Sequence, residues 1–468
     1  MANLLHRKEL AGLQAWLARP KRKPLVIRGA RQVGKSTLVR QLAAESGLAL
    51  VEINFERNPE YKEAFASNNP NEITAILGLL TGSQIEAGKT ILFFDEIQAA
   101  PEALPSLRYF YEEMQALAVI AAGSLLEFTL ADAQFSMPVG RVEYFHLGAM
   151  GFADFAQALG QAGLVDYLNK LSVHDIQQQT LPNAIHQKCL SLLRQYWVVG
   201  GMPEAIAAFA AAQDYVEVAR VQQSIVATYR DDFNKYSNGK RNELVRLVFD
   251  RLPSMVGRKF KYANISRNHR SADIEAALQQ LCLARIATKV PHSSANGVPL
   301  GAESNGKHFK TLYLDVGLQC AALKLNLLDL AKDDLTLVNN GDVAEQFIGQ
   351  QLLFSGPTFQ EPGLHYWVRE AKSAAAEVDY VLTQGQQIIP VEVKAGTSGT
   401  LKSLHQFLTE KDKSFALRFN ASTPSLLDDR KNLTDGRVVN YQLLSLPLYM
   451  VEQTERLLTE LTQGYRPI

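Results

Sequence analysis

Short apolar runs alternate with amphipathic stretches through the first third of the chain. Residues 36–42 repeat apolar side chains at positions 38, 39 and 42, which is the spacing of one helix face. Apolar runs of strand length occupy residues 24–27, 48–55, 90–94, 118–122 and 144–147. Strands that alternate with helices form a parallel sheet with helices on both faces. The pattern therefore predicts an α/β fold for residues 1–150.

The pattern becomes helical after this first region. Phe152, Phe155 and Leu159 follow one another at helical spacing, and residues 205–212 are rich in alanine. No clean strand pattern interrupts residues 151–240, so we expect a helical domain there.

A second change of pattern marks residues 241–325. Helical patterns at residues 243–249 and 271–278 precede two strand-like runs, at residues 285–290 and 309–314. Helices followed by a hairpin predict a winged-helix module.

The last part of the chain is again a mixture of strands and helices. Residues 325–342, with Asp333-Asp334 and Asn339-Asn340-Gly341, read as a linker into it. Residues 377–382 and 388–394 read as two strands joined by a Gln-Gly-Gln turn, which predicts a hairpin.

The most specific motif follows the first apolar run. Residues 29–36 read Gly-Ala-Arg-Gln-Val-Gly-Lys-Ser, the phosphate-binding pattern G-x-x-x-x-G-K-[ST] between a strand and a helix. Backbone N–H groups of such a loop point at phosphate oxygens, Lys35 reaches the β- and γ-phosphates, and Ser36 binds Mg²⁺. The chain is therefore expected to bind ATP or GTP, through Gly29, Ala30, Arg31, Gln32, Val33, Gly34, Lys35, Ser36 and Thr37.

Two carboxylates end the third apolar run, at Asp95 and Glu96. At the carboxyl end of a parallel strand, Asp95 would hold Mg²⁺ and Glu96 would orient the water that attacks the γ-phosphate. The sequence thus predicts an ATPase with ATP and Mg²⁺ as cofactors.

Two further polar residues have alternative roles. Ser124 follows the strand-like run 118–122, and either senses the γ-phosphate or caps the next helix. Arg141 stands just before another strand-like run, and either acts as an arginine finger, within the chain or across a homo-oligomer, or is a surface residue.

A second candidate site lies on the predicted C-terminal hairpin. Asp379, Glu392 and Lys394 fall on its two strands, and Glu392 and Lys394 share a face because side chains alternate along a strand. Two carboxylates and a lysine are the set with which metal-dependent nucleases bind Mg²⁺ and activate water, and Glu345 on a preceding helix is a candidate further ligand. The alternative is a hairpin whose charges are only solvated, or a nuclease-like fold without catalytic output.

Composition restricts the partners. The formal net charge is zero, so any contact with DNA or RNA must come from a local patch. Residues 258–270 provide one such basic stretch, which either binds a phosphate backbone or is a solvated face; its cations are Arg258, Lys259, Lys261, Arg267 and Arg270.

The remaining composition favours a soluble cytoplasmic protein with no membrane partner. Three widely spaced cysteines, Cys189, Cys282 and Cys320, fit a reducing compartment and no zinc site. The start lacks the apolar core of a signal peptide, and no run of about 18 apolar residues follows.

These motifs, in this order, resemble the bacterial and archaeal AAA-superfamily ATP-binding proteins with a C-terminal domain of unknown function. Further shared stretches include Val-Gly-Arg at 139–141, Met-Pro-Glu at 202–204, Lys-Phe-Lys-Tyr at 259–262, Tyr-Leu-Asp-Val-Gly-Leu at 313–318 and Tyr-Trp at 366–367. The resemblance implies a P-loop AAA core (1–150), a helical lid (151–240), a winged-helix domain (241–325) and a restriction-endonuclease-like domain (326–468). Carried over by position, it implies nucleotide-binding roles for Lys35, Ser36, Asp95, Glu96 and Arg141, and nuclease-like roles for Glu345, Asp379, Glu392 and Lys394.

Two functions remain open. In the first, ATP turnover drives a protein that cuts or grips nucleic acid. In the second, ATP occupancy sets an assembly state, and the C-terminal domain binds a protein partner without cleavage.

Overall fold

The computed structural model describes residues 5–124, 126–131, 137–236, 240–325, 340–369, 376–397, 399–433 and 436–464. It divides into two compact units. Unit 1 contains residues 1–148, 280–286 and 357–361, and unit 2 contains residues 149–279, 287–356 and 362–468. The predicted linker between residues 325 and 342 falls largely outside the described residues.

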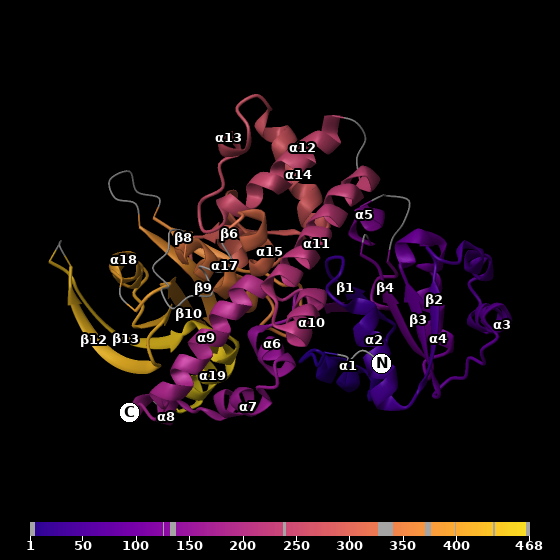
Figure 1. Ribbon diagram of the computed structural model, residues 1–468, viewed down its shortest axis with the longest axis horizontal. Coiled ribbons are helices and arrows are strands. Elements are labelled where there is room, and N and C mark those ends of the chain that lie inside the picture. Colours follow the sequence, from indigo (N-terminus) through magenta and orange to yellow (C-terminus); the bar gives the residue numbers. More distant parts are fainter. Residues whose placement is uncertain are drawn as a thin grey trace. The chain divides into compact units, whose positions relative to one another are not determined.

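Unit 1 is built on a five-stranded sheet (Figure 1). The order is β2 (Ala49–Asn54), β3 (Thr90–Asp95), β4 (Ala118–Ala122), β1 (Leu25–Arg28) and β5 (Glu143–His146), and every pairing is parallel. The predicted parallel α/β fold of the N-terminal region is therefore confirmed. Its helices are α1 (Leu10–Leu17), α2 (Lys35–Ser46), α3 (Pro70–Thr81), α4 (Ser106–Glu113) and α5 (Leu126–Ala131), with 3₁₀ turns η1 (Pro59–Phe65), η2 (Ile97–Ala99) and η3 (Pro101–Ala103).

An aromatic core fixes the end of β3. The ring of Phe94 packs edge-on against Phe65 with centroids 5.4 Å apart, and it also contacts Phe55 and Phe110. All four rings are buried, and edge-to-face pairs add about 0.5–1.5 kcal/mol each beyond the burial of their area. Because Phe94 immediately precedes Asp95, this packing holds the carboxylates that follow it in place.

Unit 2 begins with helices. These are α6 (Phe152–Ala158), α7 (Ala162–Lys170), α8 (Val173–Gln177), α9 (Asn183–Val199), α10 (Pro203–Ala212), α11 (Tyr215–Tyr236) and α12 (Lys240–Arg251). In the described part of residues 149–240 no strand is present, in line with the helical pattern of the sequence.

A helix-rich segment and a hairpin follow, as the pattern of residues 241–325 predicts. The elements are η4 (Leu252–Met255), α13 (Tyr262–Ile265), α14 (Ser271–Leu283), β6 (Ala287–Ser293), η5 (Leu300–Glu303), β7 (Ser304–Tyr313) and α15 (Val316–Ala322), and β6 and β7 pair antiparallel. This hairpin is not a separate wing, because β6 also pairs with β8 (His365–Val368) at His292 and Tyr366. The winged-helix assignment stays a prediction.

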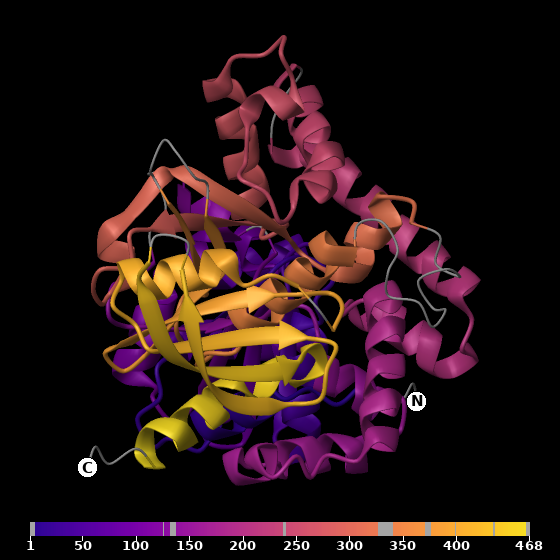
Figure 2. The same cartoon turned by 90° about the vertical axis from the view of Figure 1, so that its left-hand side faces the viewer.

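Eight strands therefore form one mixed sheet, in the order β12-β13-β11-β10-β9-β8-β6-β7. Its C-terminal strands are β9 (Glu377–Gln384), β10 (Gln387–Val393), β11 (Phe415–Asn420), β12 (Ser425–Asn432) and β13 (Val438–Pro447), shown in orange and yellow in Figure 2. The accompanying helices are α17 (Asn340–Leu353), α18 (Lys402–Glu410), η6 (Leu448–Gln453) and α19 (Thr454–Gly464).

The predicted C-terminal hairpin is present. Strands β9 and β10 pair antiparallel, and Gln384 pairs with Gln387 across a two-residue turn. Gly385 has φ +58° in this turn, a conformation that glycine adopts without strain. The register places Val391 opposite Tyr380, so the next pair along the ladder is Glu392 and Asp379.

No helix within the described ranges has both the length and the apolar character needed to cross a bilayer.

Candidate functional site: a phosphate-binding edge and a buried charge cluster

The carboxyl ends of β1, β3 and β4 meet at one edge of the unit 1 sheet, because the three strands are parallel neighbours. The loop of residues 29–34 follows β1, Asp95 and Glu96 end β3, and Ser124 follows β4. Parallel pairing thus brings together residues that are separated by up to about 95 positions in the sequence.

The loop needs its two glycines. A Cβ on Gly29 would lie 2.3 Å from the carbonyl oxygen of Leu147, and Gly34 has φ +89°. Gln32 also has a positive φ, of +63°. Helix α2 begins at Lys35, so its N-terminal N–H groups face the loop, as phosphate binding requires.

Lys35 is buried beneath this loop. Its Nζ donates to the carbonyl oxygens of Ala30 at 2.8 Å and Gly29 at 3.1 Å. Burial lowers the pKa of Lys35 to about 8, although the nearby carboxylates of Glu96 and Asp95 act in the opposite direction. An anionic phosphate would favour the charged ammonium.

Asp95 is held by two polar partners. Ser36 Oγ donates to its carboxylate oxygens at 3.1 and 3.2 Å, and Asn54 Nδ2 donates to Oδ2 at 3.1 Å. Burial and the neighbouring Glu96 raise the pKa of Asp95. A hydroxyl and a carboxylate in direct contact are oxygen donors of the kind that bind Mg²⁺, so these residues fit the expected ion. Asn54 was not identified from the sequence, although its place at the end of a strand is the signal that could have found it.

Glu96 contacts protein donors in this structure. Its Oε2 accepts hydrogen bonds from Gln98 Nε2 at 2.7 Å, Ser124 Oγ at 3.2 Å and the Ser124 backbone N–H at 3.3 Å. Glu96 has φ +51°, which is uncommon for a residue with a side chain and is found at functional turns. Ser124 therefore lies at the predicted catalytic carboxylate, and Gln98 is a second residue that sequence reasoning missed.

The other predicted loop residues line the same turn. Ala30 and Val33 are buried, Gln32 and Thr37 are exposed, and Arg31 lies between these extremes. Arg31 Nη2 is 3.9 Å from a carboxylate oxygen of Glu56.

Arg141 contacts helix α4. Its Nε donates to Glu112 Oε1 at 2.7 Å, and its guanidinium lies over the ring of Tyr111. The side chain is 42% exposed, which leaves it able to reach another molecule.

A charge network surrounds the end of β1, directly before the phosphate-binding loop. Arg28 Nε is 3.3 Å from Glu127 Oε1, and Arg285 Nη2 donates to the same oxygen at 3.1 Å. Arg285 Nη1 also donates to Glu361 Oε1 at 2.5 Å. Burial, ahead of the nearby charges, lowers the pKa of His146, which lies 3.4 Å from Glu361. The network joins three separate stretches of unit 1.

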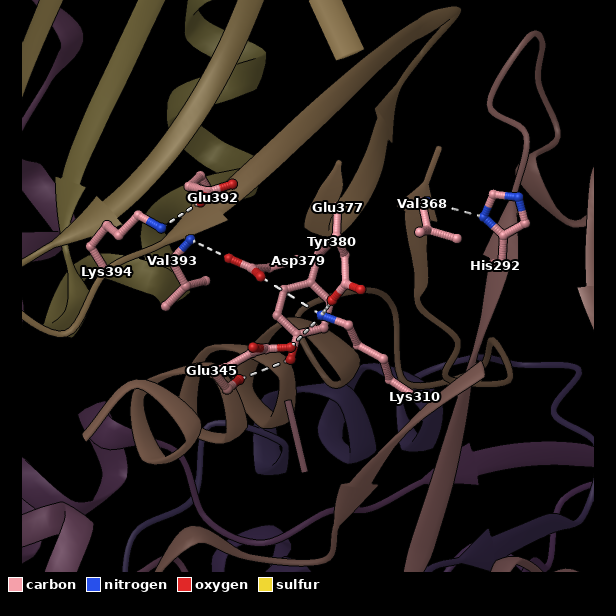
Figure 3. Close-up of polar contacts among 10 residues, drawn as sticks. All are labelled: His292, Lys310, Glu345, Val368, Glu377, Asp379, Tyr380, Glu392, Val393 and Lys394. Carbon is pink, nitrogen blue, oxygen red and sulfur yellow. Dashed lines mark hydrogen bonds and ion pairs between the residues drawn. The ribbon is translucent and has the colours of Figure 1, made fainter. Parts of the chain in front are cut away.

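The C-terminal candidate residues gather at the β9–β10 hairpin of unit 2 (Figure 3). Lys394 Nζ donates to Glu392 Oε1 at 2.5 Å, and Asp379 Oδ2 accepts the backbone N–H of Val393 at 2.8 Å. Burial and the adjacent Asp379 raise the pKa of Glu392 to about 7. The other carboxylate oxygen of Glu392 is buried and has no hydrogen-bond partner.

A lysine that the sequence did not single out lies among these carboxylates. Lys310 Nζ is 2.8 Å from Glu345 Oε1, 2.6 Å from Glu377 Oε1 and 3.7 Å from Asp379 Oδ1. Although burial lowers it, the three carboxylates together hold the pKa of Lys310 above its ordinary value. Neither Lys310 nor Glu377 belongs to a recognisable motif, so only the fold could have revealed them.

The metal-binding prediction for this cluster receives mixed support. The unpartnered oxygen of Glu392 fits a metal ligand, whereas the carboxylate of Glu345 is already bound by Lys310. Among the residues described by the structure, no three His, Cys, Asp or Glu side chains are arranged to hold one ion. The roles of Glu345, Asp379, Glu392 and Lys394 stay predictions.

Comparison with protein families decides the nature of the N-terminal region, since residues 21–156 match the model of an AAA domain. Residues 21–156 are an AAA-superfamily P-loop domain. Residues 190–329 match a domain of unknown function (DUF8612), and residues 340–440 match a second (DUF4143). The AAA domain is therefore accompanied by a C-terminal domain of unknown function, as the resemblance implied, and the nuclease-like nature of that domain stays a prediction.

The other comparisons add no functional information. No curated protein matches the sequence. The solved structure of C. elegans PCH-2 is similar at 11% identity and a TM-score of 0.29, over 46% of this chain and 65% of that one. A likeness at that level carries no argument.

The buried Lys35 gives nucleotide binding a defined pH dependence. Its pKa of about 8 means that the free AAA domain loses this proton above pH 8, and nucleotide binding must then restore it. The affinity for ATP should be constant from pH 6.5 to 7.5 and fall by up to about tenfold per pH unit above pH 8, as measured by calorimetry. Lys35→Arg does not titrate in this range. If that variant binds ATP with the same pH dependence, the proton belongs to another group.

Proposed function

We propose that this AAA protein binds ATP with Mg²⁺, hydrolyses the ATP, and uses its nucleotide state to control a C-terminal unit that acts on nucleic acid. The observation that carries the proposal is the convergence of Lys35, the Ser36–Asp95 pair and Glu96 at one sheet edge. The proposal keeps the division into a core (1–150), a lid (151–240), a winged-helix domain (241–325) and a nuclease-like domain (326–468).

Each residue of the edge has a separate task. Backbone N–H groups of the loop and the ammonium of Lys35 bind the phosphates, while Ser36 and Asp95 hold Mg²⁺, which stabilises the charge that develops on the γ-phosphate. Glu96 orients the attacking water. Ser124 and Gln98 hold its Oε2, so Oε1 is the oxygen that would accept from the water.

Glu96→Gln should keep ATP binding and lose hydrolysis, because an amide cannot polarise water as a carboxylate does. We expect turnover to fall at least ~10²-fold, measured as phosphate release, with an unchanged affinity for ATP. Lys35→Ala should weaken binding itself.

The exposed Glu102, in the adjacent turn η3, provides a matched control. Glu102→Gln should hydrolyse ATP at the normal rate. Equal turnover by Glu96→Gln and unmodified protein would rule out Glu96 as the residue that orients water.

Arg141 is proposed to act on the γ-phosphate of a neighbouring copy. It is exposed and its contact with Glu112 is one surface ion pair, which solvent screens, so leaving Glu112 costs little. Specific ATPase activity should then rise with protein concentration, and Arg141→Ala should lower turnover by ~10³-fold without removing bound ATP.

The partner of Arg141 gives the control. Glu112→Gln removes the ion pair but leaves the arginine, so it should retain or raise turnover. Full activity in a protein that stays monomeric at every concentration would exclude this role across copies.

The charge network at β1 supports coupling between the nucleotide and the rest of the chain. Ser124 contacts Glu96, and Glu127, three residues later in α5, contacts Arg285. Arg285 and Glu361 lie just before the points at which the chain passes from unit 1 into unit 2, at residues 287 and 362. A change at the γ-phosphate that moves Ser124 would therefore be transmitted to both connections.

The basic segment supports action on nucleic acid, because it begins beside the carboxylate cluster. A Cβ on Gly257 would come within 3.0 Å of Glu345 Oε2, and Arg258 Nη2 donates to Asp342 Oδ2 at 2.8 Å. Lys261, Arg267 and Arg270 are exposed. A phosphate backbone that reaches Arg258, at the start of this segment, would come close to Glu345.

Replacing Arg267 and Arg270 by glutamate should weaken binding to duplex or single-stranded DNA. We expect at least a tenfold loss at low salt and a shallower salt dependence, because each phosphate contact releases counterions. Fluorescence anisotropy of a labelled oligonucleotide measures both quantities.

Two further variants complete this experiment. Arg220→Glu changes an exposed arginine on α11 and should leave DNA binding unaltered. In a Glu96→Gln background that retains ATP, Arg285→Ala should abolish the effect of ATP on DNA affinity while leaving the affinity itself measurable. Absence of DNA and RNA binding at low salt would remove the nucleic-acid part of the proposal.

A second function is favoured by one observation. The carboxylates of Glu345 and Glu392 both have lysine partners within the chain. If nucleic acid does not bind, the protein is better described as an ATP-controlled switch whose C-terminal domain binds a protein partner without cleavage.

A further inference from the structure

Lys310 occupies an unusual position for a lysine. It lies on β7, its side chain is 2% exposed, and its Nζ is surrounded by the carboxylates of Glu345, Glu377 and Asp379. Figure 3 shows these acidic side chains converging on the Lys310 nitrogen. The ring of Tyr366 lies 5.3 Å from the same nitrogen, within the range of a cation–π contact.

These contacts satisfy the ammonium almost completely. A lysine has three N–H donors, and two carboxylates lie within hydrogen-bond distance of Nζ with a third at 3.7 Å. An uncompensated ammonium in this place would cost several kcal/mol, so Lys310 needs these carboxylates. The buried carboxylates need Lys310 for the same reason.

The cluster nevertheless has more carboxyl groups than ammonium groups. Four carboxylates, on Glu345, Glu377, Asp379 and Glu392, face two ammonium groups, on Lys310 and Lys394. The unmatched part lies on the Glu392 side, where Oε2 is buried without a hydrogen-bond partner and the residue is 6% exposed. The two halves of the cluster therefore differ: one is filled by Lys310 and the other has a free acceptor.

We propose that Lys310 is an internal cation that permanently holds Glu345, and that a divalent cation at this site binds Asp379 and Glu392 without Glu345. This inference rests on the proposed nuclease-like C-terminal domain and on the metal site that its sequence predicts. The sequence predicted three carboxylate ligands for the metal. The proposed site has two, because the ammonium of Lys310 occupies the place beside Glu345.

The origin of Lys310 in the fold explains why it stays in place. It comes from the β6–β7 hairpin, whereas Glu345 lies on α17 and Asp379 on β9. Phe260 N–H donates to the carbonyl oxygen of Phe309, and the rings of Phe260 and Phe309 stack with centroids 5.1 Å apart. Burial of Phe309 and Leu312 on either side of Lys310 further restrains the strand. Withdrawal of the ammonium would require this packing to open.

Metal binding by variants of the full chain tests the proposal. Every variant carries Asp95→Asn and is nucleotide-free, so that the ion counted is not at the ATP site, and Mn²⁺ is the probe, counted by electron paramagnetic resonance. The reference protein should bind one Mn²⁺. Glu345→Gln should still bind it, with the dissociation constant changed by less than about threefold, because Glu345 is not a ligand. Asp379→Asn and Glu392→Gln should each lose it.

Removing Lys310, in contrast, should destabilise the protein and create a second metal site. Lys310→Ala leaves buried carboxylates without their counter-ion and should lower the melting temperature by roughly 10 °C. Mn²⁺ should restore part of this loss by binding in place of the ammonium, as a second ion that requires Glu345. Lys310→Ala with Glu345→Gln should melt higher than Lys310→Ala alone and bind no second ion. Lys307→Ala, which removes an exposed lysine from the same strand, β7, is the matched control and should change neither quantity.

The outcomes separate the inference from the proposed metal function. Loss of the single Mn²⁺ in Glu345→Gln would overturn the inference, and this arm does not depend on whether Lys310→Ala folds. If no variant binds Mn²⁺, the C-terminal unit does not bind metal, and the proposed ligands Asp379 and Glu392 are excluded as well. The role of Lys310 as counter-ion would then stand only if Lys310→Ala is destabilised and Glu345→Gln relieves it. An unaltered melting temperature in Lys310→Ala would refute that role as well.

Discussion

Parallel pairing of β1, β3 and β4 is the constraint on which the nucleotide site depends. Strands that run in one direction end at one edge of the sheet. This pairing alone brings together the loop after β1, the carboxylates at the end of β3 and the serine after β4. The aromatic packing around Phe94 fixes the position of Asp95. The contact between Ser36 and Asp95 links the start of α2 to the end of β3. A cavity in this core would therefore displace the carboxylates of Asp95 and Glu96, which it does not touch.

Features formed by residues close together in the sequence were predicted, whereas contacts between residues far apart in the sequence were not. The glycine loop, the strand ending in Asp95 and the β9–β10 hairpin are local patterns, and each is present where the sequence placed it. Asn54, Gln98 and Lys310 were missed because each acts through a partner that only the tertiary fold brings close. The joining of the β6–β7 hairpin to the C-terminal sheet was also missed, because it depends on pairing across more than seventy residues.

The C-terminal cluster shows why residue types alone do not define a metal site. The same carboxylates can face a divalent ion or an ammonium, and the choice depends on which strand lies next to them. Lys310 balances one half of the cluster, while the buried oxygen of Glu392 is left without a donor. A buried charge is stable only when compensated, so the two halves must be satisfied by different means.

The proposed coupling between ATP and the rest of the chain rests on where the charged residues lie along the sequence. Glu127 contacts both Arg28, which precedes the phosphate-binding loop, and Arg285, which precedes the return of the chain to unit 2. Glu361 occupies the equivalent place at the second return and shares Arg285. The two chain connections therefore share Arg285. A shift of α5 on a change at the γ-phosphate would act on both, which is the property that a nucleotide-controlled device needs.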